Sequence, residues 1–363
     1  MIIIAGFIFV FTLIQLVVAI VNLLFETNLP EADNCSNDLV SVLIPARNEE
    51  DNISNILSDL MRQDYRKIEV IVFNDQSEDR TEKIVTEYTI RDHRIRLLNS
   101  EGLPDGWLGK NFACHSLSKQ AKGDFLLFLD ADVRISNNLI GNAVSFSEKH
   151  NTDLISIFPK QIIKTFGERI TVPNMNYILV SLLPLILVRR VRYPSLAAAN
   201  GQFMFFRTDL YKSQKPHLIM KNNKVEDIAI ARAYKKRGEK VACFLGNETI
   251  NCRMYKGFRE SVNGFSKNVI AFFGNSFILA SLFWLITSFG FLIVLFELPS
   301  EWFLPYLIAF LLTRIIISSI SRQNILNNLI FIIPLQFSMG LFIYKAFINK
   351  YFRKFQWKGR SIN

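Results

Sequence analysis

Two pairs of acidic residues are the part of this sequence best suited to chemistry on a phosphorylated substrate. Asp130 and Asp132 directly follow an apolar run, and Glu226 and Asp227 open a helical pattern. Two carboxylates at i and i+2 beyond a strand can bind Mg²⁺ or Mn²⁺, one directly and one through water. Such a cation would neutralise a diphosphate and assist its departure. For Glu226 and Asp227 the alternative is an acid pair that only stabilises the first turn of its helix.

Polar residues also follow two earlier apolar runs and precede helical patterns. The first cluster is PARNEE at 45–50, and the second is NDQSED at 74–79. Free N–H groups at a helix start favour anions, and Asp75 can accept a hydrogen bond from a base or a sugar. Capping is the alternative explanation for both clusters, with Asn48 or Ser77 as the helix cap.

Lys110 lies in the turn PDGWLGKN at 104–111, next to a predicted helix start. A positive charge is unfavourable there, because the helix dipole is positive at its N-terminus. We interpret Lys110 as a contact to a nucleotide phosphate. A solvent-exposed lysine without such a role is the alternative.

Apolar runs rich in β-forming residues alternate with helical patterns in the middle of the chain. The runs predict strands at 39–45, 68–74 and 124–129, and the patterns predict helices at 49–62, 78–91 and 110–122. Strands that alternate with helices of this length form βαβ units and a parallel sheet. Such open sheets bind ligands at the carboxyl ends of their strands, which is where the polar clusters lie. The sequence therefore predicts an α/β fold with its site at that edge.

Long apolar segments flank this middle part and exclude a wholly soluble protein. Residues 1–25 carry no charged side chain and are long enough to cross a bilayer. A cleaved signal peptide is the alternative, but no basic residue precedes the apolar run. Residues 269–344 carry only four charged side chains, and apolar segments cover 269–296, 302–320 and 325–344 within this range. We predict a membrane anchor at 1–25 and transmembrane helices within 269–344.

The positive charge is concentrated at the end of the chain. Residues 345–363 hold six Lys or Arg and no acid, whereas residues 26–268 hold 34 basic and 30 acidic residues. This distribution argues against nucleic-acid binding and for a cytoplasmic basic tail. If residues 38–268 share that side, an even number of crossings must follow them. One of the three segments, which the sequence does not identify, is therefore expected to lie in the interface or to re-enter the membrane. Residues 172–188 contain prolines and precede three arginines, which predicts another interfacial helix.

Several motifs together resemble a known family. They are IPARNEE, FNDQSEDRT, GWLGKNFA, AKGDFLLFLDADV, GQFMFF, VEDIAIA and RMYKGFRESVNGFSKN. The series is similar to the inverting family 2 glycosyltransferases of GT-A fold. Within them it most resembles the membrane-bound branch that glucosylates bacterial carotenoids, the chlorobactene and diaponeurosporenoate glucosyltransferase type. The GWLGKNFA turn and the closing WKGR favour that branch.

The resemblance implies a role for each residue that matches a motif of the family. Asp132 is the expected direct metal ligand and Asp227 the expected catalytic base. The residues implied to bind the nucleotide-sugar are Pro45, Ala46, Arg47, Glu49, Asp75, Lys110 and Asp130. Those implied to bind Mg²⁺ or Mn²⁺ are Asp130 and Asp132, and those implied in catalysis are Glu226 and Asp227. No Gln-x-x-Arg-Trp follows the Glu-Asp pair, which argues against polymer synthesis. Either Arg253 or Lys267 is expected to secure the leaving diphosphate instead.

The implied function is that of a multi-pass hexosyltransferase of the cell membrane with a cytoplasmic GT-A domain at 38–268. It would move a hexose, most simply glucose, from a UDP-sugar to a lipophilic acceptor such as a carotenoid hydroxyl or carboxylate. The alternatives are another lipid acceptor (a polyprenyl phosphate, hopanoid or glycerolipid) and a catalytically silent nucleotide-sugar-binding scaffold. The sequence leaves the oligomeric state open.

Overall fold

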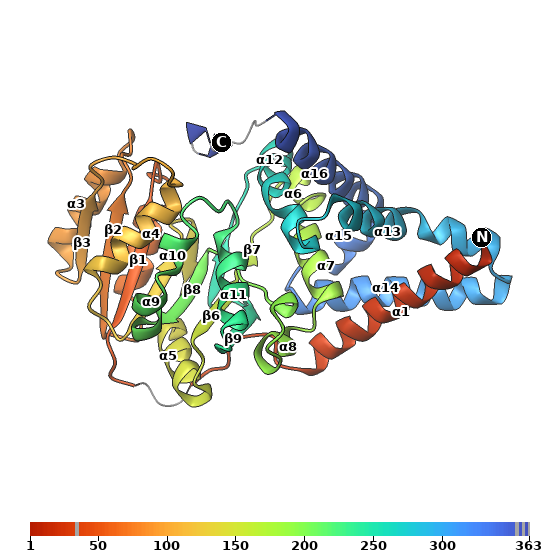
Figure 1. The fold of residues 1–363 in the computed structure, drawn as a ribbon, viewed down its shortest axis with the longest axis horizontal. Coiled ribbons are helices and arrows are strands. Elements are labelled where there is room, and N and C mark those ends of the chain that lie inside the picture. Colours follow the sequence, from red (N-terminus) through yellow and green to blue (C-terminus); the bar gives the residue numbers. More distant parts are fainter. Residues whose placement is uncertain (33–35, 353–355, 358–359, 362–363) are drawn as a thin grey trace.

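The computed structural model describes residues 1–32, 36–352, 356–357 and 360–361. It consists of an α/β domain and a group of long apolar helices beside it (Figure 1). The predicted basic tail falls partly outside the described residues, at 353–355, 358–359 and 362–363. The short strands β11 (Gln356–Trp357) and β12 (Arg360–Ser361) pair with each other within that tail.

A mixed, mostly parallel sheet forms the centre of the α/β domain and confirms the predicted fold class. Its strand order is β3-β2-β1-β4-β8-β6-β9, with β8 antiparallel to both of its neighbours. The strands are β1 (Val40–Ala46), β2 (Ile68–Asn74), β3 (Ile95–Asn99), β4 (Phe125–Leu129), β6 (Leu154–Phe158), β8 (Phe203–Arg207) and β9 (Val241–Leu245). The three predicted strands correspond to β1, β2 and β4 within one residue at each end. Because β1, β2 and β4 are parallel, their carboxyl ends meet at one edge.

Helices cover both faces of this sheet. They are α2 (Ile53–Met61), α3 (Thr81–Arg91), α4 (Gly109–Gln120), α5 (Leu139–His150), α9 (Thr208–Gln214), α10 (Pro216–Ile219) and α11 (Glu226–Lys236). The other elements of the domain are β5 (Val133–Ile135), β7 (Lys160–Gln161), β10 (Ile250–Cys252), α6 (Phe166–Arg169), η1 (Pro194–Leu196), α12 (Phe258–Asn268) and η2 (Val269–Phe273). Strands β5, β10 and β7 form a second, small sheet.

The expected caps Asn48 and Ser77 do not cap helices, which corrects that prediction. Helices α2 and α3 begin several residues later, and their N-cap positions are Asn52 and Arg80. Instead, the two expected caps bridge the loops after β1 and β2. The Asn48 N–H donates to Ser77 Oγ (3.1 Å), and the Glu78 N–H donates to Asn48 Oδ1 (2.9 Å). The polar side chains thus join two strand ends rather than stabilise helix ends.

Four helices of the described chain are long and apolar enough to cross a membrane: α1 (Ile2–Leu24), α13 (Phe277–Glu297), α14 (Phe303–Ile320, after η3 at Ser300–Trp302) and α16 (Ile332–Phe352). The third predicted segment, 325–344, is wrong in its bounds. A break at Phe331 separates the short α15 (Ile325–Ile330) from α16, which continues beyond residue 344.

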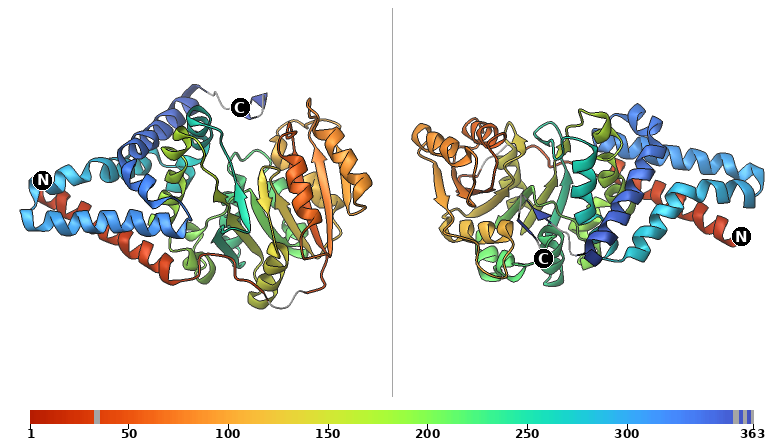
Figure 2. Two further views of the ribbon diagram at one scale, coloured as in Figure 1. Left: turned by 180° about the vertical axis from the view of Figure 1, so that it is seen from behind. Right: turned by 90° about the horizontal axis from the view of Figure 1, so that it is seen from above.

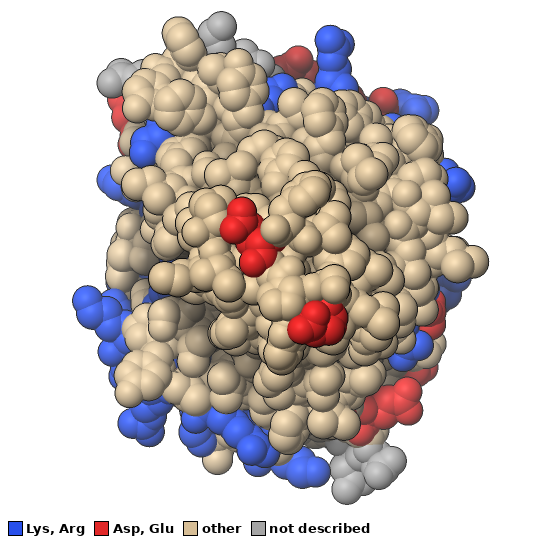
Figure 3. Space-filling view, turned by 90° about the vertical axis from the view of Figure 1, so that its right-hand side faces the viewer, with Lys and Arg blue, Asp and Glu red and all other residues tan. Residues whose placement is uncertain are grey.

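Three of these helices, α1, α13 and α14, project together from the α/β domain, whereas α16 lies across their base (Figure 2). Helix α16 packs against α12 and α7, where Phe342 and Phe265 have ring centroids 5.2 Å apart. It is also the least apolar of the four candidate spans. A view of the projecting end shows a mostly uncharged surface with two acidic spots near its centre, whereas Lys and Arg, with some Asp and Glu, lie around the edge of the view (Figure 3).

The expected interfacial segment 172–188 forms two short helices between the domain and the projecting helices. These are α7 (Pro173–Leu182) and α8 (Leu185–Arg190), and most residues of α7 are buried. Asn22 of α1 fixes the bend between them. Its side-chain amide donates to Val180 O (3.0 Å) and Leu183 O (2.9 Å) and accepts from the Leu185 N–H (2.7 Å).

Asn22→Ala is therefore expected to destabilise the protein by about 3 kcal/mol, because buried backbone groups lose hydrogen-bond partners at about 1 kcal/mol or more each. Thermal unfolding of the full chain in detergent measures the effect. Leu23→Ala is the matched control, since Leu23 is exposed on the same helix. Equal melting temperatures for the two variants would contradict this role of Asn22.

Candidate functional site

The loops after β1 and β2 are held against each other by a buried arginine. Arg47 Nη1 donates to Asp75 O (2.6 Å) and to Gln76 O (3.0 Å), and the Asp75 N–H donates to Ala46 O (2.8 Å). Pro45 and Ala46 are the last residues of β1, and Ala46 is buried. Arg47 thus shapes the strand-end loops through their backbone, and Asp75 lies buried beneath them.

A cluster of charged groups lies where β4, β8, α4 and α11 meet. Lys110, at the start of α4, contacts the Asp130 carboxylate at 2.8 Å and donates to Gly201 O at 3.2 Å. Its ammonium also lies 3.8 Å from Glu226 Oε1. The Asp227 carboxylate accepts the N–H of Gly201 (2.9 Å). We call Lys110, Asp130, Glu226 and Asp227 the charged cluster; these four predicted residues come together although they are far apart in sequence.

Burial is the largest influence on the pKa values of Glu226 and Asp227. It raises the pKa of Glu226 to about 7, an effect that Lys110 opposes and Asp227 reinforces. Burial also raises the pKa of Asp227, against the N–H groups of Ile228 and Gly201 and the charge of Lys110. Burial alone would lower the pKa of Lys110, but the negative charges of Asp130 and Glu226 raise this pKa above its ordinary value. The alternative of a solvent-exposed lysine at 110 is wrong, because its ammonium is enclosed by carboxylates.

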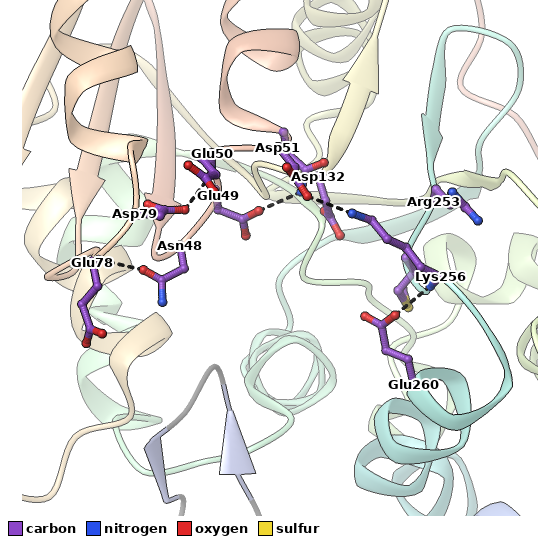
Figure 4. Close-up of a pocket in the computed structure, with 12 residues that line it drawn as sticks. Asn48, Glu49, Glu50, Asp51, Glu78, Asp79, Asp132, Arg253, Lys256 and Glu260 are labelled. Atoms are coloured by element: carbon purple, nitrogen blue, oxygen red, sulfur yellow. Dashed lines mark hydrogen bonds and ion pairs between the residues drawn. The ribbon is translucent and has the colours of Figure 1, made fainter.

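Asp132 faces a cleft of about 550 Å³ beside the charged cluster (Figure 4). Gln202 Nε2 donates to Asp132 Oδ1 (3.3 Å) and to Cys252 Sγ (2.9 Å). Burial, with further contributions from Asp130 and Glu49, raises the pKa of Asp132 to about 6. The carboxylate therefore lies in a negative environment that a cation would relieve.

The cleft as a whole is strongly acidic. Its charged lining consists of Glu49, Glu50, Asp51, Glu78, Asp79, Asp132, Glu260, Arg253 and Lys256. Both bases are engaged by acids, since Lys256 pairs with Asp51 at 3.0 Å and Arg253 pairs with the buried Glu168 at 2.8 Å. A diphosphate in this cleft would need a bound cation.

The donor set at Asp130 and Asp132 fits a magnesium-type ion. Within the described residues no group of three or more His, Cys, Asp or Glu side chains is arranged to hold a metal by itself. Mg²⁺ is usually held by one or two carboxylates together with substrate phosphates and water, so two aspartates suffice. Asp132 points into the cleft, whereas Asp130 is already paired with Lys110.

The two candidates for securing a leaving diphosphate are separated by the fold. Arg253 follows β10 and lines the cleft. Lys267 lies in the last turn of α12 and is not among the described residues that line the cleft. Of the two, Arg253 is the one whose position fits the expected role.

Gly201 and Gln202 are site residues for which no role was predicted from the sequence. A side-chain carbon at 201 would lie 2.9 Å from Lys110 Nζ and 3.4 Å from Glu226 Oε1, so glycine leaves the space that the ammonium occupies. The only signal in the sequence was the Gly-Gln pair before the apolar strand FMFF. Nothing in the sequence indicates a role for Lys256 or Glu168, because their ion-pair partners lie in distant segments of the chain.

Comparisons with known proteins agree with this arrangement. Residues 41–214 match the profile of the family described as glycosyl transferase family 2. The 4,4'-diaponeurosporenoate glycosyltransferase of Staphylococcus haemolyticus (strain JCSC1435) is 26% identical over 239 residues, which cover 63% of this chain and 60% of that protein. Its namesake from Staphylococcus aureus (strain USA300) is 26% identical over 247 residues, 65% of this chain and 62% of that protein. The match thus spans about three fifths of these relatives.

One solved structure shares the fold along nearly the whole chain. It is the mannosyltransferase PcManGT from Pyrobaculum calidifontis in complex with GDP-Man and Mn²⁺, with a TM-score of 0.55 and 15% identity. The alignment covers 96% of this chain and 99% of that one. The likeness confirms a GT-A type sheet accompanied by long apolar helices.

Proposed function

Because this chain is a family 2 glycosyltransferase, we propose that it transfers a hexose, glucose in the simplest case, from a UDP-sugar to a lipophilic acceptor. The observation that carries the proposal is the charged cluster beside an acidic cleft, at the base of apolar helices. We propose a carotenoid hydroxyl or carboxylate as the acceptor. The names of the relatives from Staphylococcus support that choice.

The cleft would receive the donor. Arg47, Glu49 and Asp75 would border the uridine, as the loops after β1 and β2 form one side of the cleft. Asp132, with Asp130, would hold Mg²⁺ or Mn²⁺, which when bound supplies positive charge to the leaving diphosphate. The complex of PcManGT with Mn²⁺ supports this proposal. Lys110 would bring a second positive charge close to the same group.

Asp227 would act as the general base of an inverting displacement. Its carboxylate would take the proton of an acceptor hydroxyl as the bond to the anomeric carbon forms and UDP leaves. Burial raises its pKa, which brings its basicity closer to that of a useful base at neutral pH. A carboxylate acceptor arrives ionised and would not need this step.

Incubation of the purified full chain in nanodiscs with UDP-[¹⁴C]glucose tests the proposed function. The expected product is a labelled lipid, formed with a carotenoid alcohol or acid in the disc. Product formation only with a polyprenyl phosphate, hopanoid or glycerolipid would instead assign the other acceptor class. No turnover of any UDP-sugar with any of these acceptors would refute the proposal.

Gly201→Ala is expected to lower kcat by about 100-fold, because the added carbon forces the Lys110 ammonium out of the charged cluster. The radiochemical assay measures this loss. Gly6→Ala is the matched control, since a carbon at residue 6 meets nothing within 4 Å. Equal activity of the two variants would show that the position of Lys110 is unimportant.

We further propose that α1, α13 and α14 cross the membrane and that α16 lies at its surface on the cytoplasmic side. This arrangement gives an even number of crossings after residue 268, so the domain and the basic tail share one side. The cross-wise position of α16 and the absence of exposed Lys and Arg from α1, α13 and α14 support it.

Cysteine labelling in intact cells tests this topology in a Cys35→Ser background, in which the remaining cysteines are buried. Ser300→Cys, between α13 and α14, is expected to react with a membrane-impermeant maleimide. Lys350→Cys, at the end of α16, is expected to react only after permeabilisation. Labelling of residue 350 from outside would mean that α16 crosses the membrane.

A further inference from the structure

Two apolar cavities lie on the side of the charged cluster that faces the projecting helices. The outer one has a volume of about 720 Å³ and opens between α1 and α13. Its wall there is formed by Phe7, Phe11, Leu279, Leu282, Phe283 and Ile286. Phe7 and Leu279 are more than half exposed, as expected for side chains that face hydrocarbon.

The inner cavity is smaller, about 150 Å³, and lies between α7, η1 and α11. One wall consists of the small side chains Ala197, Ala198 and Ala199, which leave room beside them. The buried Lys235 holds this wall in place, because its ammonium donates to Leu196 O (2.8 Å) and Val188 O (2.9 Å).

The two cavities are contiguous, because they share the lining residues Leu182, Ser195, Arg232 and Phe272. The inner cavity ends near the charged cluster, although none of the four cluster residues lines it. Ile228, which lines it, directly follows Asp227 in α11, and Ala199 lies two residues before Gly201, the hydrogen-bond donor to Asp227. The two cavities together thus form an apolar path that leads from the surface of α1 and α13 to residues next to the proposed base in the chain.

We infer that this path binds the hydrocarbon chain of the acceptor, which passes from the bilayer between α1 and α13 and presents its terminal polar group at Asp227. The inference rests on the proposed function. Only a long apolar chain suits a path whose outer wall faces lipid and whose inner end lies near the charged cluster. The combined space is in the range of pockets that enclose most of a small ligand.

Arg232 is the only charged residue among the described residues that line the two cavities. Its guanidinium donates to Ala271 O (3.2 Å) and lies at the junction between them. It shares a face of α11 with Ile228, from which it is four residues, about one turn, away. The junction would thus select the acceptor. It would admit a single hydrocarbon chain, and the positive charge of Arg232 would favour a chain that ends in a carboxylate or another anionic group.

Ser195→Trp tests the path, because residue 195 is exposed at the junction and a tryptophan there fills space without disturbing the core. The probe is a 16-carbon carboxylic acid carrying a diazirine, photolysed with the full chain in nanodiscs. We expect adducts on peptides that contain residues 194–199 and 277–286, reduced at least tenfold by Ser195→Trp. Ser213→Trp, an exposed position on α9, is the matched control and should leave the adducts unchanged.

Hydrolysis of UDP-glucose by water, which yields UDP and glucose, is measured in parallel. We expect it to remain within twofold of wild type in Ser195→Trp, since the cleft for the donor is separate. Adducts that are absent from these peptides, or unchanged by Ser195→Trp, would overturn the path. Adducts as expected, in a wild-type chain that turns over no UDP-sugar, would refute the proposed function and leave the binding path in place.

Discussion

Asp227→Asn is expected to lower kcat by about 10²–10⁴-fold while the affinity for UDP changes little. The substitution keeps the size of the side chain but removes its basicity. Asparagine can still accept the Gly201 N–H or the Ile228 N–H, the two donors that the carboxylate now binds. If only kcat falls, the loss is therefore due to the missing proton transfer and not to a displacement of helix α11.

Two controls accompany this experiment. Thermal unfolding of Asp227→Asn shows whether α11 keeps its place, since a first-turn acid alone stabilises its helix by only about 0.3–1 kcal/mol. Glu226→Gln tests the neighbouring carboxylate, whose pKa is also raised. If Asp227→Asn keeps more than about a tenth of wild-type kcat with a hydroxyl acceptor, Asp227 is not the base. Glu226, or an acceptor that needs no base, would then explain the activity.

Removal of divalent cations is expected to abolish transfer, and Mg²⁺ or Mn²⁺ is expected to restore it. The cleft that would hold the diphosphate is lined by seven acids and two paired bases, so an anionic donor meets net repulsion without a cation. Transfer is measured in excess EDTA and again after each metal is added back. Full activity in EDTA would exclude a metal role.

The two aspartates should differ in this assay. Asp132→Ala removes the carboxylate that faces the cleft and should reduce Mn²⁺ affinity more than Asp130→Ala does. Loss of an indirect ligand typically costs about 10–100-fold. Because Asp130→Ala also frees Lys110 from its ion pair, Mn²⁺ binding in the presence of UDP is a cleaner measurement than activity. Equal affinities for the two variants would contradict Asp132 as the direct ligand.

The sequence predicted the sheet and its acidic strand end because both are local patterns. Strands β1, β2 and β4 are short apolar runs between helical patterns, and Asp130 and Asp132 follow one of them directly. The features that could not be predicted from the sequence depend on contacts between distant segments. Gly201 and Lys110 are 91 residues apart, and nothing in either motif indicates that the ammonium fills the space that the glycine leaves.

The starts of α2 and α3 and the position of α16 were missed for the same reason. Asn48 and Ser77 have the residue types of helix caps, but their side chains accept hydrogen bonds from the backbone of the neighbouring strand-end loop instead. Helix α16 is apolar enough to span a membrane, and its proposed position at the membrane surface rests on its packing against α12, which the sequence does not show.

The bend that Asn22 fixes also has a consequence for the order of events during synthesis. Its hydrogen-bond partners lie 158 to 163 residues later in the chain. At about 5–20 residues per second, a ribosome needs on the order of ten seconds or more to make them. In the proposed topology, α1 is inserted in the bilayer during that interval, so the contacts of Asn22 with residues 180–185 would form only after insertion.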